Sequence, residues 1–387
     1  MQKDMFSHRL RSYILVLLLF MLPAGEAPAQ KPYRALTLMH RDGRLTERPV
    51  RVDFLNDQLQ IHHPWIDSLH VYRLDSVTYE EGIPELEELH GTPLDLQFKS
   101  RNGKIRLQPH TPEYYAIFSA YHTIEAIRQY KKWFGDLTNF TRKKRFRQLE
   151  LYLGDYFNCN PGQYVLDPRK KVSPTVIYHE VGHRAFCQLD DTLRIGNVFT
   201  MVHNGLMEYF TATIADYPVI GEGMLPNPLL RDASQTVHYP QDKYYFSDFI
   251  RDLKDSYDPS MDCEEAMRQL YKINVERAKR CTTQIEMTHQ SGMLITHPLW
   301  KLRQQTGASV SDTLVVHAMK NMEETFSRRE KYMKKTLYKA EKQPQWYDLL
   351  YALYVSDQHL YKGKHLPLIR QIFKKTGYKT NIVKMPE

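Results

Sequence analysis

The chain has 387 residues and a formal net charge of +8, with 53 Lys and Arg against 45 Asp and Glu. Part of this charge comes from two clusters, at 142–147 and 328–335. Their helical spacing is typical of solvated helix faces rather than of a surface for nucleic acid or an acidic partner. The length exceeds what one domain needs, and the absence of an internal period of roughly 20 to 50 residues disfavours a repeat array.

Residues 1–29 have the pattern of a secretory signal peptide. A basic stretch leads into the apolar run YILVLLLFML at 13–22, and Ala27 and Ala29 stand two apart shortly after it. We expect cleavage after Ala29 and a soluble mature protein, secreted or periplasmic, with no stable insertion into a membrane. The apolar run is short for a permanent span of roughly 20 residues, so an uncleaved anchor is the lesser alternative.

Residues 30–110 are predicted to form a small antiparallel β domain. Apolar and polar residues alternate in short runs at 50–55, 59–63, 69–74 and 94–98, and the turn sequences RDGR and RNGK occur in the same region. Alternation with a period of two is typical of strands with one buried face. The predicted fold class is therefore α+β, with this β domain first.

A long amphipathic helix is predicted to begin the next unit. Apolar side chains recur at three-residue steps from Phe118 to Tyr130, and Gly135 ends the run. The stretches at 149–157 and 163–168 then suggest one or two strands. From about residue 261 onward the pattern is mostly helical.

The sequence TVIYHEVGHRAF lies on a predicted helix that starts at Ser173 and Pro174, a capping serine followed by proline at the first helical position. Positions i and i+4 share one face of a helix, so His179 and His183 can direct a ring nitrogen at one ion. Glu180 projects roughly 100° around the helix, toward a water on that ion. Because the rest of the helix is apolar, burial of these polar side chains needs a compensating partner, which a zinc ion would provide. The alternative is an accidental HExxH pattern.

Two further residues of this helix have structural interpretations. Gly182 costs about 1 kcal/mol relative to alanine inside a helix, which indicates close packing there. Cys187 lies one turn beyond His183, but ligands on three successive turns span about 12 Å and cannot meet at one ion. Cys187 is therefore predicted to be packed or disulfide-bonded. Two disulfides could form in any of three pairings among Cys159, Cys187, Cys263 and Cys281.

The third zinc ligand is expected from a second helix. In the mostly apolar run NGLMEYFTATIAD, Glu208 is the single acid of the first half, and a lone carboxylate there needs a partner. We predict that Glu208 completes the site. His203 is the lesser candidate, and a solvent-facing glutamate is the alternative without function. Asp190 and Asp191 follow His183 too soon for an easy return of the chain.

HEVGH followed by a glutamate on a second helix, 25 positions after His183, resembles the gluzincin superfamily of zinc metallopeptidases. The flanking sequence is most similar to thermolysin- and fungalysin-like peptidases. The similarity extends to FSAYHTIEAIRQYKKWFG, SGMLITHPLWKLRQQTG and YALYVSDQHL, and covers roughly residues 111–378. It implies a zincin-like catalytic subdomain at 111–260 and a helical C-terminal subdomain at 261–387.

The resemblance also implies roles for individual residues. His179, His183 and Glu208 would be the zinc ligands, and Glu180 the general base and later the proton donor to the leaving amine. Thermolysin-like enzymes place a histidine shortly before a Ser-Gly turn, and His289 precedes such a dipeptide here, one residue closer. His289 would then stabilise the oxyanion, although a surface or structural histidine is the alternative.

The sequence departs from the family in two respects. Thermolysin-like enzymes orient the first histidine with an aspartate at the position of Ala212, so another group must supply the hydrogen-bond acceptor for His179. The longer HExxHxxGxxH pattern is also absent, because Phe186 and Leu189 stand where its glycine and last histidine would be. This difference excludes a metzincin.

The sequence therefore predicts a secreted zinc metallopeptidase, an endopeptidase, that hydrolyses peptide or protein substrates with a zinc-activated water and Glu180 as base. A zincin-fold binding protein with a metal site but little turnover is the alternative from another class. Retention of Glu180 argues against it, since such a protein has no use for a base. An exopeptidase would need an acid cluster for the substrate amino terminus, and none is evident near the zinc helix.

Overall fold

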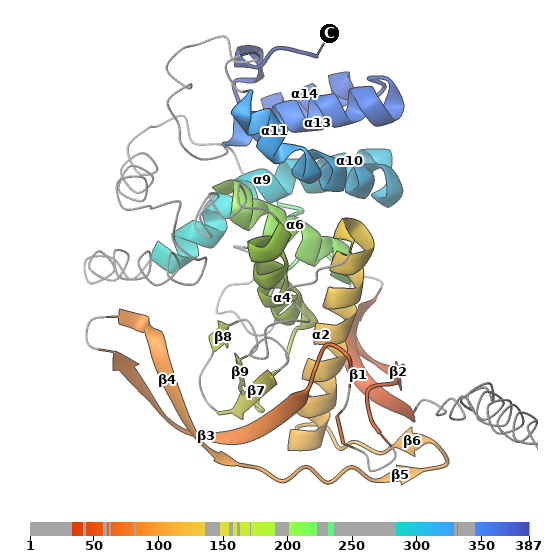
Figure 1. The fold of residues 1–387 in the computed structure, drawn as a ribbon, viewed down its shortest axis with the longest axis vertical. Coiled ribbons are helices and arrows are strands. Elements are labelled where there is room, and N and C mark those ends of the chain that lie inside the picture. The colour runs from red at the N-terminus through yellow and green to blue at the C-terminus, as the bar shows by residue number, and fades with distance from the viewer. Residues whose placement is uncertain are drawn as a thin grey trace, which may run out of the picture.

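The computed structural model describes five stretches of the chain, with short gaps. These are 33–135, 148–189, 201–235, 284–328 and 345–386, together with residue 331, and the gaps are 42–43, 57–59, 62, 81–82, 155–157, 161–162, 171 and 223–230. Within them the fold is mixed α and β. Figure 1 shows the strands gathered around one end of the long helix α2 and the C-terminal helices at the opposite end of the molecule.

The first sheet has four strands in the order β2-β1-β6-β5. Strands β1 (Tyr33–Arg41) and β2 (Arg44–Val52) pair antiparallel up to Arg41 and Arg44, the outer residues of the predicted RDGR turn. Strands β5 (Ser100–Arg101) and β6 (Lys104–Ile105) flank the predicted RNGK turn. There Asn102 and Gly103 have φ angles of 53° and 70°, as a two-residue hairpin requires. The antiparallel N-terminal strands are thus confirmed.

The second sheet has five strands in the order β4-β3-β7-β9-β8. Their bounds are β3 Ser68–Glu80, β4 Ile83–Pro93, β7 Gln148–Leu153, β8 Asn158–Asn160 and β9 Gln163–Leu166. β3 pairs antiparallel with β4 and parallel with β7. Strands from both sides of residue 110 therefore share this second sheet, whereas all four strands of the first sheet lie before residue 110.

Two strand predictions in this region were wrong. The alternating run at 94–98 forms no strand, and the described residues of the run at 59–63 contribute only isolated bridges, through Ile61 and His63. Strand β4 was missed, because its sequence IPELEELHGTP is rich in charge and lacks a clear alternation. Its pairing along β3, rather than its own pattern, makes it a strand.

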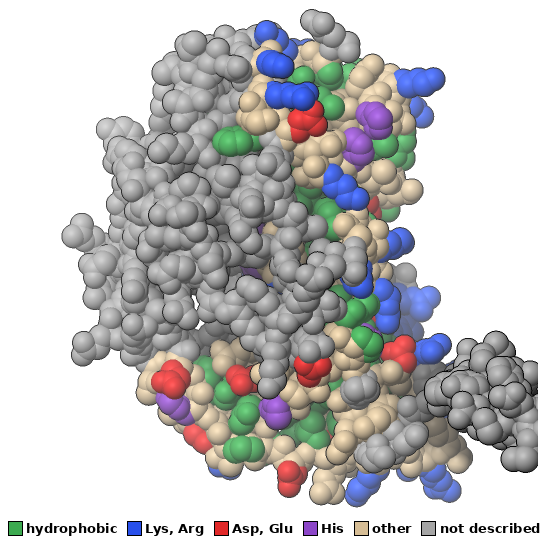
Figure 2. All heavy atoms as spheres, viewed as in Figure 1, with side chains coloured by type: hydrophobic (Ala, Val, Ile, Leu, Met, Phe, Trp, Pro, Cys, Tyr) green, Lys and Arg blue, Asp and Glu red, His purple; other side chains and the backbone are tan. Residues whose placement is uncertain are grey.

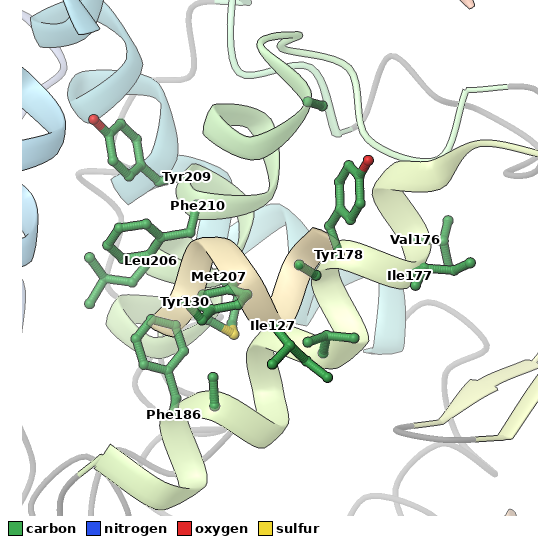
Figure 3. Packing of buried hydrophobic residues seen from close by; sticks show 14 of the residues in the cluster. Ile127, Tyr130, Val176, Ile177, Tyr178, Phe186, Leu206, Met207, Tyr209 and Phe210 are labelled. Atoms are coloured by element: carbon green, nitrogen blue, oxygen red, sulfur yellow. The ribbon is translucent and has the colours of Figure 1, made fainter. Parts of the chain in front are cut away.

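The central layer consists of α2 (Pro112–Phe134), α4 (Pro174–Leu189) and α6 (Met201–Ala215). Helix α2 begins at the N-cap Thr111 and ends at Gly135, whose φ is 83°. Figure 3 shows buried side chains of the three helices packed together, among them Tyr130, Phe186 and Met207. A β-carbon on Gly182 would collide with the Tyr130 hydroxyl and lie 3.0 Å from the Met207 sulfur. The close packing predicted at Gly182 is therefore confirmed.

From residue 284 onward the described residues of the C-terminal part are mostly helical, as predicted, whereas 261–283 lie outside the described residues. Its elements are α9 Gln284–Thr306, α10 Ala308–Lys320, α11 Met322–Ser327, α13 Trp346–Tyr361, α14 Leu366–Lys375 and the 3-10 turn η4 Thr380–Ile382. Across the stretches that the structure describes, no helix is both long and apolar enough to cross a membrane.

Helix α9 corrects one prediction about its own start. It runs without interruption through Ser291 and Gly292, where a turn was expected. Gly292 lies against Asn204 and Gly205 of α6, so its missing side chain serves the crossing of the two helices rather than a turn. His297 lies within α9 and is buried, with Nδ1 3.2 Å from the Ala233 carbonyl oxygen.

His122 gives the fold an acid-sensitive contact. The ring is completely buried, with Nδ1 2.7 Å from the Tyr178 hydroxyl and Nε2 2.8 Å from the Leu38 carbonyl oxygen. Burial lowers the pKa of His122 to about 3. The unfolded chain takes up a proton here below a pKa of about 6.5, and the folded chain does not until the pH approaches 3.

We therefore expect the free energy of unfolding to fall as the pH drops below about 6.5, with a contribution from His122 of up to roughly 1.4 kcal/mol per pH unit. Urea unfolding at neutral and mildly acidic pH measures this loss. His122→Gln should be less stable at neutral pH but should lose less on acidification. An identical pH dependence in both proteins would remove His122 as its source.

Candidate metal centre

Helices α4 and α6 lie side by side and bring the predicted site residues together. The apolar packing that Figure 3 shows holds the two helices in contact, with Phe186 on α4 against Phe210 on α6. The site side chains of α4 are His179, Glu180 and His183, and those of α6 are His203 and Glu208. The rings of His179 and His183 are 2% and 9% exposed, so their nitrogens need partners within the protein.

The two histidines of HEVGH converge as their spacing predicts. The Nε2 atoms of His179 and His183 are 2.8 Å apart, and the two rings are perpendicular. The other nitrogen of His183, Nδ1, lies 3.2 Å from Nε2 of His203, whose ring is stacked on that of His183. His203 therefore lies behind His183, at the nitrogen opposite the one that faces His179.

Glu208 is completely buried beside His179. Its Oε2 lies 3.5 Å from Nδ1 of His179, and the residue has no exposed surface. The alternative of a solvent-facing glutamate is therefore wrong. As the side chains lie, however, the carboxylate is next to the nitrogen of His179 that points away from His183. Glu208 thus takes the place of the expected acceptor for His179 at position 212. Ala212 is buried on α6 and has no polar side-chain atom.

Arg231 is the site residue that the sequence analysis missed. Its Nη2 donates to Oε1 of Glu208 and lies 3.3 Å from Nδ1 of His179, and its side chain is only 11% exposed. Arg231 is 23 residues from Glu208 and 52 from His179, outside any helical pattern that contains them. A lone buried carboxylate was the only signal for it, because such a group needs a cation.

The electrostatics favour a neutral first histidine and a weakly acidic Glu180. Burial lowers the pKa of His179, although Glu208 opposes the shift. Glu180 keeps part of its surface exposed, but desolvation raises its pKa to about 8, with Arg231 opposing the rise and Glu208 adding to it. A neutral imidazole is the form that binds a metal ion.

Several residues named in the sequence analysis lie wholly or partly outside the described residues. His289 lies in the first turns of α9, and its side chain is outside the described residues. The same holds for the side chain of Cys187, for Asp190 and Asp191, and for the signal peptide at 1–29. The disulfide pairings and the oxyanion role of His289 therefore stay predictions.

The donor atoms are of the kind that bind zinc, but the side chains are not arranged as in an assembled zinc site. Two imidazoles and one buried carboxylate are a set that zinc uses in hydrolases. Within the part of the chain that the structure describes, no three His, Cys, Asp or Glu side chains converge so as to hold a metal ion as they lie. The carboxylate of Glu208 accounts for the difference, since it faces Arg231 and the outer nitrogen of His179.

No protein-family model matches the sequence, and a comparison with curated proteins finds no match either. The interpretation of this centre therefore depends on its own residues and geometry.

Proposed function

We propose that the chain is a zinc-dependent peptidase, with His179, His183 and Glu208 as metal ligands and Glu180 as general base. The observation that supports this best is the 2.8 Å separation of the two Nε2 atoms beside a carboxylate without exposed surface. Two histidines and a glutamate buried together are costly without a shared cation. Arg231 contacts Glu208 and one nitrogen of His179, whereas a zinc ion would be shared by all three side chains.

Each residue has a task in this proposal. Zinc, when bound, supplies the positive charge that lowers the pKa of a water to about 7 and polarises a carbonyl group. Glu180 takes the proton of the attacking water and passes it to the leaving amine. The same positive charge would lower the pKa of Glu180 and favour the carboxylate that this task requires. His203 would orient the ligand His183, and Arg231 would orient the ligand Glu208.

The Arg231 ion pair favours a second candidate, a zincin-fold binding protein with little turnover. In that case Arg231 would keep the charge of Glu208 neutralised, and the site would need no catalytic cycle. Zinc analysis of the purified exported chain, together with a casein hydrolysis assay with and without chelator, separates the two. Chelator-sensitive hydrolysis supports the peptidase, and zinc without hydrolysis supports the binding protein.

The proposed function first predicts the zinc content. The purified protein should contain about one zinc per chain, and His179→Ala or His183→Ala should abolish it, because either change removes one of the ligands that a zinc site needs. His359→Ala is the matched control, since His359 is exposed on the distant helix α13. Elemental analysis after dialysis gives the ratio. Full occupancy in both α4 variants would mean that the zinc binds elsewhere.

A second prediction separates Glu208 from His203. Glu208→Ala should weaken zinc binding strongly, because it removes the buried carboxylate beside His179. His203→Ala should weaken it by at most roughly 10- to 100-fold, the effect typical of a group that orients a ligand. Competition with a chromogenic chelator measures both affinities. If His203→Ala proves the more damaging, the third ligand is His203 and Glu208 only orients His179.

A further inference from the structure

The four-stranded sheet carries a row of cations that the proposed peptidase site does not use. In the strand pairing, Arg34 on β1 is opposite Arg51 on β2 and also beside Lys104 on β6. Lys104 is in turn opposite Arg101 on β5. All four residues are exposed. Because strands lie about 4.8 Å apart, the row crosses the sheet over roughly 14 Å.

The strands themselves fix this row. Arg101 and Lys104 flank the two-residue turn at Asn102 and Gly103, which places them opposite each other. The Gly103 carbonyl oxygen accepts the backbone N–H of Arg34 at 2.9 Å, so this hairpin is attached to β1. On β1 and β2 the next residues in sequence, Ala35 and the opposite Val50, are buried, so the cations occupy the other face.

Like charges directly opposite one another destabilise a sheet, so strand pairing does not account for the row. Among the described residues, no carboxylate forms an ion pair with Arg34, Arg101 or Lys104. Nε of Arg51 lies 3.8 Å from Oδ2 of Asp53, but both side chains are well exposed, and exposed ion pairs contribute little to stability. Lys99 precedes Arg101 by two residues and Arg106 follows Lys104 by two, and both are exposed as well and extend the same charge.

An apolar side chain lies next to this charge. Leu36 follows Arg34 by two residues on β1, hence on the same face, and 48% of it is exposed. Its partner on β2 is the exposed Pro49. Figure 2 shows Lys and Arg side chains on the side of the molecule where Figure 1 places these strands. A soluble polyanion has no use for an exposed leucine, whereas the interface of a lipid bilayer accepts both kinds of side chain.

We propose that this basic face, formed by Arg34, Arg51, Arg101 and Lys104 with Leu36 beside them, binds the surface of anionic phospholipid membranes. The cations meet the headgroup phosphates, and Leu36 enters the boundary between headgroups and acyl chains. The association is peripheral and reversible, since the face has a single large apolar side chain and no spanning segment. It is independent of the metal centre, which lies between α4 and α6 rather than on this sheet.

Sedimentation with vesicles tests the proposal on the exported chain. Vesicles of phosphatidylcholine with phosphatidylglycerol should bind the protein, and vesicles of phosphatidylcholine alone should not. Each Lys or Arg near an anionic surface strengthens binding by roughly fivefold, so the double variant Arg34→Gln, Lys104→Gln should bind about 30-fold more weakly. Leu36→Ser should weaken binding without removing the preference for the anionic lipid.

The matched control is Lys374→Gln, Lys375→Gln, which removes the same charge from exposed positions on α14. It should change vesicle binding by less than about threefold. The thermal midpoint of Arg34→Gln, Lys104→Gln should stay the same or rise, since the row destabilises the sheet. Equal loss of binding in both double variants would overturn the proposal. A second result would also overturn it. The parent protein would bind neither kind of vesicle but would be retained on dextran sulfate, and Arg34→Gln, Lys104→Gln would lose that retention.

Discussion

Glu180→Gln is expected to lower peptide hydrolysis by roughly 10²- to 10⁴-fold while zinc content and fold stay unchanged. Glutamine has nearly the same shape, so it preserves the packing of α4. Its amide cannot take a proton from the attacking water, and the general-base step is lost. Chelator-sensitive hydrolysis of casein, normalised to the zinc content of each preparation, measures the effect.

Two further variants make this result specific. Glu180→Asp keeps a carboxylate but withdraws it by one methylene group, so it should retain more activity than Glu180→Gln while remaining below the parent. Glu324→Gln removes an exposed carboxylate on α11 and should leave activity unchanged. Hydrolysis by Glu180→Gln at the parental rate would remove Glu180 from the mechanism. If the parent binds zinc but hydrolyses nothing, the binding-protein alternative holds.

The helices of this fold could be predicted because their signals are local. Apolar periodicity predicted α2, the pattern beyond residue 261 predicted the helical C-terminal part, and a capping serine with proline predicted the first residue of α4, Pro174. Strand β4 could not be predicted in the same way, since its pairing with β3 outweighs its own composition. The dipeptide at Gly292 was misassigned for a related reason. A glycine that allows helices to cross has the same local sequence as one that makes a turn.

The site shows the same division between local and long-range information. Spacing on one helix placed His179 and His183 together, and a lone acid in an apolar run indicated Glu208. The contact of Arg231 with both helices depends on the path of the chain after α6, which no short pattern encodes. It bears directly on function, because the guanidinium group and a metal ion would compete for the charge of the same carboxylate.

Among the described glycines, Gly205 at the crossing of α6 and α9 has the shortest contact for an added β-carbon, and Gly205→Ala is expected to destabilise the fold by up to about 2 kcal/mol. A β-carbon at Gly205 would collide with Cβ of Ile295 and lie 2.6 Å from the carbonyl oxygen of Gly292. Neither atom is the end of a flexible side chain, so the helices must move apart. Overpacking of this kind typically costs about 1–3 kcal/mol, and the better helix propensity of alanine offsets about 1 kcal/mol.

Gly292→Ala provides the comparison on the opposite helix. Its β-carbon would lie 2.9 Å from Cβ of Asn204 and 3.0 Å from the backbone nitrogen of Gly205, contacts that are less severe. Its loss of stability should therefore be smaller than that of Gly205→Ala in urea unfolding. Glu208 follows Gly205 by three residues on α6, so displacement of that helix should also weaken zinc binding in proportion to the loss of stability. An unchanged unfolding midpoint in Gly205→Ala would mean that the two helices do not approach so closely.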